Sequence, residues 1–244
     1  MTDACPSEKK RRIARASAGF VLWAAGLAGL AAAVSLIPER TGGNPPVIDG
    51  TITAEEWQGA RRESFSDGSE LVLLRLGDEL YLGIRAKTQD MIAANVFIES
   101  ADGIAIHHAS AALGTAAYER DGDVWRLVRN FTWRCRGAGD GEETRAERDA
   151  FLREEGWIAS TSWMGNPHEL EYRIRTGPAA LRLAVVFLRA SVPNAKTPWP
   201  AVLDDDCIKP TPKGLPPALS FAPEKWATIA PGNVTRPSEI ALSR

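Results

Sequence analysis

The sequence is poor in the residue types that most often carry chemistry. Its 244 residues include only three cysteines, three methionines and three histidines. It contains no GxSxG, HExxH or P-loop pattern, which are the motifs of serine hydrolases, zinc proteases and nucleotide-binding domains. Its formal net charge of −2 shows no basic excess, which nucleic-acid binding would require. We therefore expect a protein that is not an enzyme and has no nucleic-acid partner.

The N-terminus combines a basic stretch, residues 1–15, with an uncharged run, residues 16–37. The run is long enough to cross a bilayer as one helix, which takes about 20 apolar residues. A cleaved signal peptide and a buried core helix are the alternatives. The basic flank places the N-terminus in the cytoplasm. We predict a single-pass membrane anchor with the remaining domain periplasmic or extracellular, or a secreted domain if the segment is cleaved.

Only two cysteines follow this run, Cys135 and Cys207. In an oxidising compartment such a pair is a candidate disulfide. Closing a loop of about 70 residues would stabilise the fold by roughly 4 kcal/mol in the chain-entropy model. Two buried free thiols are the alternative, and we predict the disulfide.

From residue 69 onward the chain has the pattern of a series of short strands. The segments LVLLRL and LYLGIRA flank a turn at Gly77, a spacing typical of a β-hairpin. Apolar and charged residues alternate in HELEYRIR, residues 168–175, so the face with Glu169 and Glu171 is expected to meet water. The charge-rich segment 140–156 predicts one surface helix.

Many short strands separated by turns predict a mainly β protein. We expect an antiparallel β-sandwich of the jelly-roll or immunoglobulin-like type, with one or two short helices, over residues 45–230. Its last part, after Ser191, is Pro-rich and is expected to be an irregular arm, because proline cannot join the middle of a sheet. We expect residues 231–244 to be disordered.

The stretch VIDGTITAEEWQGA, residues 47–60, begins the domain and contains two local structural signals. Thr53 and Glu56 have the spacing of a capping box, and Ile52 and Trp57 have the spacing of a hydrophobic staple. These signals predict a short capped helix that turns Trp57 inward. The stretch is therefore expected to be structural.

Three segments, PPVIDGTITAEEWQGA, LVLLRLGDELYLGIRA and HELEYRIR, together resemble the family 9 carbohydrate-binding modules and their DOMON-like relatives. The similarity spans roughly residues 45–190. It implies a β-sandwich fold and a binding function, and related domains bind sugars or haem. In this family the Asp-Gly pair and the tryptophan of the opening segment are mainly structural, which agrees with the capping analysis. The later part, from FTWRCRG to DDDC, departs from the family pattern.

Tryptophan side chains are the first candidates for a sugar site. Sugars stack on aromatic faces while their hydroxyls bond to polar side chains. Trp133, Trp163 and Trp199 lie near the ends of predicted loops, so we select them as candidate platforms, with packing in the core as the alternative.

Three consecutive carboxylates, Asp204, Asp205 and Asp206, are a weak candidate for calcium because that ion prefers hard oxygen ligands. They lack the spacing of an EF-hand, and a solvated or Arg-paired run is the alternative. His107 and His108 are neighbours in a predicted strand and point to opposite faces, so they cannot share one ion. Haem ligation by a His/Met pair remains a further alternative.

Together these observations predict an exported, membrane-anchored, non-catalytic module that recognises carbohydrate or glycan, with no obligatory cofactor. Two alternatives remain open at this point. One is a haem-binding electron-transfer domain of the same fold, and the other is an envelope interaction domain without a small ligand.

Overall fold

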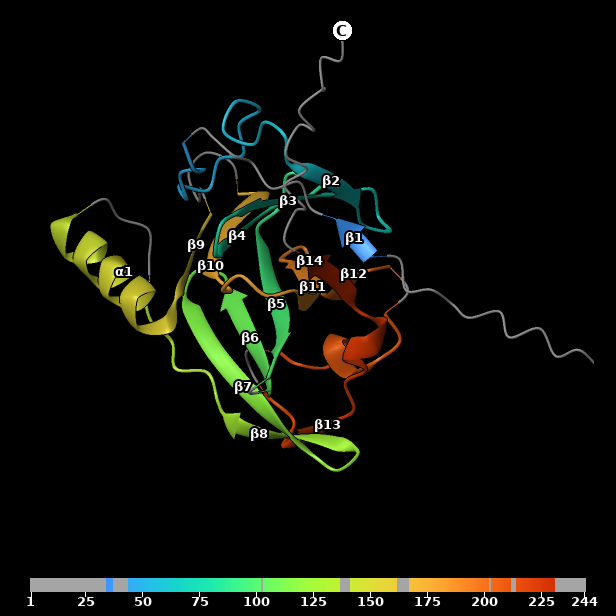
Figure 1. The fold of residues 1–244 in the computed structure, drawn as a ribbon. Helices are drawn as coiled ribbons and strands as arrows, with labels where there is room; N and C mark the ends of the chain where they lie inside the picture. The colour runs from blue at the N-terminus through green and yellow to red at the C-terminus, as the bar shows by residue number, and fades with distance from the viewer. Residues whose placement is uncertain are drawn as a thin grey trace, which may run out of the picture. The chain divides into compact units, whose positions relative to one another are not determined.

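The computed structural model describes residues 44–101, 103–136, 141–161, 167–201, 203–211 and 214–230, together with the strand Val34–Leu36. All of these residues belong to one unit, residues 32–244. The unit is mainly β, with two sheets and one α-helix (Figure 1). The prediction of a mainly β, antiparallel protein is confirmed.

The larger sheet has nine strands and is antiparallel except at one end, where β1 runs parallel to β14. Strand β11 is its branch point, because one part of β11 pairs with β14 and another part with β12. Along the sheet the strands are β1 (Val34–Leu36), β14 (Ala227–Ala230), β11 (Leu181–Arg189), β5 (Ile92–Ser100), β6 (Gly103–Ala109), β7 (Leu113–Asp121), β8 (Val124–Arg129) and β13 (Ala218–Leu219), with β12 (Val192–Trp199) beside β11.

The smaller sheet has five antiparallel strands. In order they are β2 (Arg61–Ser64), β3 (Glu70–Leu76), β4 (Glu79–Arg85), β10 (Glu169–Arg175) and β9 (Trp157–Ser160). Helix α1 (Glu142–Glu155) precedes β9, and short 3₁₀ turns occupy Asp206–Ile208 and Pro223–Lys225. Helix α1 lies where the charge-rich segment predicted it, and Gly156 ends it in the left-handed conformation.

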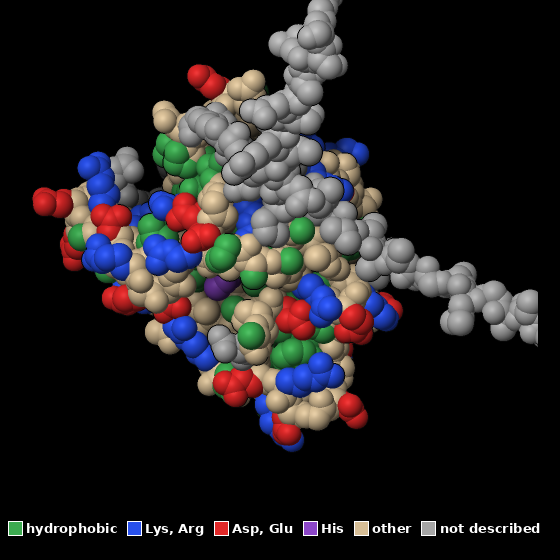
Figure 2. All heavy atoms as spheres, in the orientation of Figure 1, with side chains coloured by type: hydrophobic (Ala, Val, Ile, Leu, Met, Phe, Trp, Pro, Cys, Tyr) green, Lys and Arg blue, Asp and Glu red, His purple; other side chains and the backbone are tan. Residues whose placement is uncertain are grey.

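Helix α1 touches the core mainly through Phe151, which is buried and packs edge-on against Trp157. The rest of the helix surface is charged. Figure 2 shows acidic and basic side chains intermingled on this part of the molecule. The helix is therefore mostly solvated, and Phe151 together with the partly buried Leu152 anchors it to the core.

One apolar cluster contains residues from both sheets. Leu170, Tyr172 and Ile174 of β10 join alternate residues of β5 and β11, such as Val96 and Val185. The Tyr172 hydroxyl also donates a hydrogen bond to the backbone carbonyl of Ala94, at 2.9 Å, and so links the two sheets. The alternation of apolar residues along β10 therefore predicts correctly which face of this strand packs against the other sheet.

A second apolar cluster involves the opposite face of the nine-stranded sheet, where Phe97 and Tyr118 meet the C-terminal arm. The arm contributes Cys207, Phe221 and Trp226. The arm is less irregular than predicted, since residues 192–199 form β12 despite their prolines. These prolines are tolerated because β12 pairs with β11 alone, as an edge strand.

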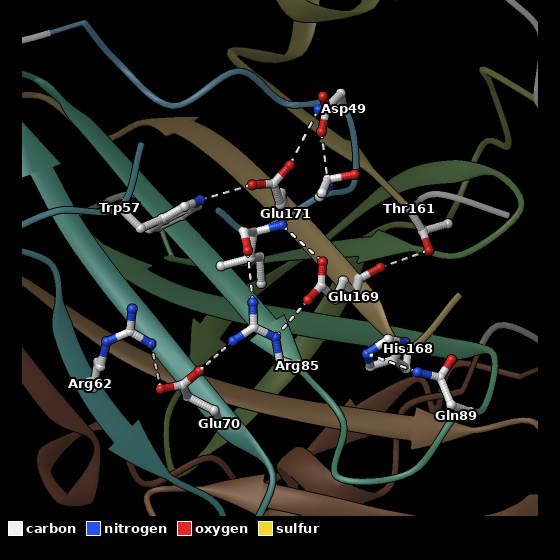
Figure 3. Close-up of polar contacts among 12 residues, drawn as sticks. Asp49, Trp57, Arg62, Glu70, Arg85, Gln89, Thr161, His168, Glu169 and Glu171 are labelled. Carbon is white, nitrogen blue, oxygen red and sulfur yellow. Dashed lines mark hydrogen bonds and ion pairs between the residues drawn. The ribbon is translucent and has the colours of Figure 1, made fainter. Parts of the chain in front are cut away.

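The opening stretch, residues 47–60, is fastened to the five-stranded sheet by a buried carboxylate on β10 (Figure 3). Glu171, with 0% exposure, accepts hydrogen bonds from the backbone N–H groups of Asp49 at 3.2 Å and Gly50 at 2.8 Å. Its other oxygen accepts from Trp57 Nε1 at 2.9 Å. One side chain thus satisfies three donors of the opening stretch.

Glu169, two residues earlier on the same face, makes a second attachment. It accepts from the backbone N–H of Ile52 at 2.9 Å and pairs with Arg85 Nε at 2.5 Å. Arg85 in turn donates to the Ile52 carbonyl at 2.7 Å. The prediction that Glu169 and Glu171 face water was wrong, because the opening stretch covers them and supplies their hydrogen-bond partners.

The local signals within the opening stretch are present in the structure. The Glu56 N–H donates to Thr53 Oγ1 at 3.3 Å, as in a capping box, although the Glu56 carboxylate accepts from the Thr53 hydroxyl instead of its N–H. Ile52 and Trp57 pack in one cluster, as the staple requires. The segment forms turns and not a regular helix.

The predicted localisation, a single-pass anchor in the cell membrane with a periplasmic or extracellular domain, must be corrected. Val34–Leu36 fall within the predicted membrane helix, yet they form a strand whose partners are Thr228–Ala230. Within the described ranges, no helix has the length and apolar character needed to cross a bilayer. The remainder of the predicted segment 16–37, the basic stretch 1–15 and the predicted tail 231–244 lie outside the described residues.

Gly83 on β4 allows the opening stretch to approach the sheet closely. A Cβ at this position would lie 2.5 Å from Val72 Cγ2 and 2.9 Å from Ile52 Cδ1. We expect Gly83→Ala to lower the free energy of unfolding by about 1–3 kcal/mol through overpacking, as measured by urea denaturation. Gly214→Ala is the control, because a Cβ there meets nothing within 4 Å. Equal losses in both variants would contradict this packing role.

Burial raises the pKa of the Glu171 carboxyl from 4.5 to about 7. Between these values the folded state holds a proton that the unfolded state has released, so the free energy of unfolding falls as the pH rises through this window. We expect Glu171→Gln to flatten this dependence in urea titrations from pH 4.5 to 7.5. Glu142→Gln, at an exposed position on α1, should keep the wild-type slope. A wild-type slope in Glu171→Gln would contradict the assignment.

Candidate functional site

A pocket of about 250 Å³ lies where several strands of the two sheets end. Strand β5 contributes its first residues and β11 its last. The five-stranded sheet contributes the residue that follows β9 and a residue shortly before β10. The pocket is lined by Met91, Ile92, Ala93, Ser110, Ala111, Thr161, Pro167, Leu188, Arg189 and Ala190.

Arg189 is the charged residue in this lining, and its pairing is incomplete. Its Nη1 lies 3.9 Å from Asp67 Oδ2, which is longer than a hydrogen bond. Arg189 Nε and Asp67 Oδ2 are both buried atoms without a hydrogen-bond partner in the described part of the chain. Leaving such groups unpaired costs about 1–3 kcal/mol each, so the pair is an unsatisfied donor and acceptor beside the pocket.

The hydroxyl groups of the lining are already engaged within the chain. Thr161 Oγ1 donates to the Glu169 carbonyl at 2.8 Å. Ser110 Oγ donates to the Ala112 carbonyl at 3.4 Å. The pocket wall therefore offers a ligand fewer hydrogen-bond donors than its composition indicates.

His168 stands next to the pocket residue Pro167 and close to Thr161 (Figure 3). The exposed Gln89 amide nitrogen lies 3.4 Å from His168 Nε2. His168 Nδ1 is buried and has no partner among the described residues. His168 is thus a further polar side chain near the edge of the pocket.

Of the three predicted tryptophan platforms, the two that the structure describes, Trp133 and Trp199, are not brought together. Trp133 is partly exposed and stacks on Phe131, with 4.9 Å between ring centroids. Trp199 is only 5% exposed and belongs to the cluster between the sheets, so it offers no open face. Trp163 lies outside the described residues, and neither of the other two lines the pocket.

The neighbouring histidines point to opposite faces of the nine-stranded sheet, as predicted. His107 packs on Trp157, in the cluster between the sheets. His108 packs against Phe131 and Trp133, and its Nδ1 lies 2.7 Å from Asn95 Oδ1. Burial lowers the pKa of each imidazole to about 4, so both are neutral at pH 7.

The aspartates of the predicted calcium run hold the C-terminal arm. Asp204 pairs with Lys225 at 2.7 Å, and Asp206 accepts from the Ser220 N–H at 2.9 Å. Asp205 accepts from Trp226 Nε1 at 2.7 Å and also from the backbone N–H groups of residues 207 and 222. Across the described ranges, no group of three or more His, Cys, Asp and Glu side chains is placed to hold a metal ion.

The predicted disulfide is absent. Cys135 and Cys207 are both free and buried, and burial raises the pKa of each thiol. Cys135 belongs to the cluster between the sheets, whereas Cys207 lies in the cluster beneath the arm. Those clusters use alternate residues of β5, Val96 in one and Phe97 in the other, and therefore lie on opposite faces of one sheet.

Sequence reasoning missed the Arg189 and Asp67 pair. Arg189 is the last residue of β11, after an apolar run typical of a central strand. Asp67 lies in a turn after β2. The only available signal was a charged residue at the end of a buried strand, which is where sites on β-domains gather.

Comparison with known proteins gives one structural similarity. No protein-family model matches the chain, and no curated protein matches it. The chain is similar to a carbohydrate-binding module family 9 domain from Caldicellulosiruptor kristjanssonii, solved in complex with cellotriose. The TM-score is 0.43 and the identity 12%, over 86% of this chain and 100% of that chain. The predicted resemblance to this family is confirmed. A likeness at this level does not assign a role to any residue of this chain.

Because the two described thiols are free, a reductant should not change the stability of the protein. We expect the urea midpoint to be the same with and without dithiothreitol. A disulfide between Cys135 and Cys207 would instead cause a loss of roughly 4 kcal/mol on reduction. A free energy of unfolding that falls by that amount in dithiothreitol, seen as a lower urea midpoint, would contradict the free-thiol state.

Proposed function

We propose that this protein is a non-catalytic carbohydrate-binding module on a β-sandwich of the jelly-roll or immunoglobulin-like type. Its ligand binds at the pocket where the strands end. The observation that carries the proposal is the pair Arg189 and Asp67, which leaves a donor and an acceptor unused at a pocket with an apolar wall.

The chemistry of a sugar matches these features. A hydroxyl group both donates and accepts, so sugar hydroxyls match both an unpaired donor such as Arg189 Nε and an unpaired acceptor such as Asp67 Oδ2. Sugar rings also present apolar C–H faces, which pack against exposed apolar side chains at the edge of the pocket, such as Met91. The pocket volume, about 250 Å³, lies just below the usual range for whole ligands, so it suits one part of a larger molecule.

The lining also supports binding without catalysis. Glycoside hydrolysis usually requires two carboxylates that flank the scissile bond. Among the lining residues that the structure describes there is no carboxylate, and within the same described ranges Asp67 is the acid paired to the lining residue Arg189. One carboxylate is enough to accept a hydroxyl proton in a hydrogen bond, but it does not provide the acid and the base or nucleophile of that reaction.

Arg189→Gln tests the proposed site. We expect about 10- to 100-fold weaker binding, because a lost hydrogen bond to a charged group is worth about 1.5–3 kcal/mol. The measurement is isothermal titration calorimetry with a panel of soluble oligosaccharides that includes cellotriose. Arg153→Gln, at an exposed position on α1, is the matched control and should bind as the wild type does.

Urea denaturation of both variants separates binding from folding. Asp67→Asn provides a second test, since it keeps the shape of the side chain and removes the charge. If no oligosaccharide of the panel binds the wild-type protein, the proposed function is wrong. If oligosaccharides bind and both Arg189→Gln and Asp67→Asn leave the affinity unchanged, the site lies elsewhere on the protein.

A further inference from the structure

The wall of the pocket has little capacity to bond with hydroxyl groups. The protons of Thr161 Oγ1 and Ser110 Oγ are donated to backbone carbonyls. Most other lining side chains are apolar, among them Met91, Ala93 and Leu188. A sugar ring buried deep in this pocket would leave several hydroxyls unpaired, and each unpaired hydroxyl would weaken binding roughly 5- to 150-fold. The interior is therefore suited to an apolar group.

The apolar surface continues out of the pocket. Met91, a lining residue, is 41% exposed, and Val192 is 43% exposed. The Ala190 N–H donates to the Met91 carbonyl at 2.8 Å, and Val192 is the strand partner of Arg189, so both exposed side chains lie on chain segments beside the pocket. The chain segments next to Arg189 thus carry exposed apolar side chains.

We infer that the ligand is a glycoside that carries an alkyl or aryl substituent, and that this substituent enters the pocket. The sugar ring remains at the Arg189 and Asp67 pair, so the inference rests on the proposed function. The volume is sufficient, because an apolar cavity of about 150 Å³ accommodates benzene, and this pocket has about 250 Å³.

The inference predicts a graded dependence on chain length. Each buried methylene is worth about 0.8 kcal/mol, which corresponds to roughly a fourfold gain in affinity. We expect affinity to rise from methyl to butyl to hexyl β-glucoside. Titration calorimetry below the micelle concentration measures this series. Glucose and 1-hexanol, titrated separately, measure the contribution of each half of the ligand.

A pocket-filling variant locates the effect. Ala93 is partly exposed on β5 and lines the pocket, so Ala93→Phe should fill part of the volume without entering the core between the sheets. We expect it to abolish the advantage of hexyl over methyl glucoside. Ala146→Phe, at an exposed position on α1, is the matched control and should keep that advantage. Ala111→Phe, in the exposed turn after β6, is a second filling variant should Ala93→Phe fold poorly.

The outcomes separate this inference from the proposed function. Stronger binding of hexyl glucoside than of methyl glucoside and of 1-hexanol, lost in the filling variants, supports it. Equal affinities of the three glucosides, or glucosides that do not bind while panel oligosaccharides do, overturn it and leave the carbohydrate function intact. Equal binding of hexyl glucoside and 1-hexanol overturns it as well, because the sugar then contributes nothing. No binding of any glucoside or oligosaccharide overturns both.

Discussion

The buried carboxylate of Glu171 holds the opening stretch, residues 47–60, on the five-stranded sheet. It accepts three hydrogen bonds from a stretch more than a hundred residues earlier in the chain, from Asp49, Gly50 and Trp57. A buried carboxylate is costly unless such donors surround it, and the backbone donors need such an acceptor because the stretch forms no regular helix. Each side therefore satisfies the other, and the outer face of the five-stranded sheet is closed by this exchange.

With that face covered by the opening stretch, and the far face of the nine-stranded sheet covered by the C-terminal arm, both sheets have most of their strand surface engaged. The ends of the strands are different. There the chain passes between elements, and at one such end β5 and β11 leave a pocket with an incompletely paired Arg189. Binding at strand ends is possible because the packed faces hold these ends in fixed positions.

Several residues that were selected by type serve the fold instead. Trp199 fills the core, and Asp205 fixes the arm by accepting from Trp226. A tryptophan or an aspartate has the same chemical capacity in a core, a cap or a site. Its use depends on which donors, acceptors and apolar surfaces the folded chain places around it. Residue type alone therefore does not separate a structural use from a binding use for Trp199 and Asp205.

Local patterns in the sequence were sufficient for strands β3 to β11 and for helix α1. They were also sufficient for the opposed directions of His107 and His108 and for the structural role of Trp57, since each of these features depends on residues close in the chain. Three other features depended on the tertiary structure: the burial of Glu171, the separation of the two cysteines on opposite faces of one sheet, and the pairing of Asp67 with Arg189. Periodicity shows that a strand has two faces. Which distant segment covers each face, and which polar atoms it leaves unpaired, is decided only when the sheets pack.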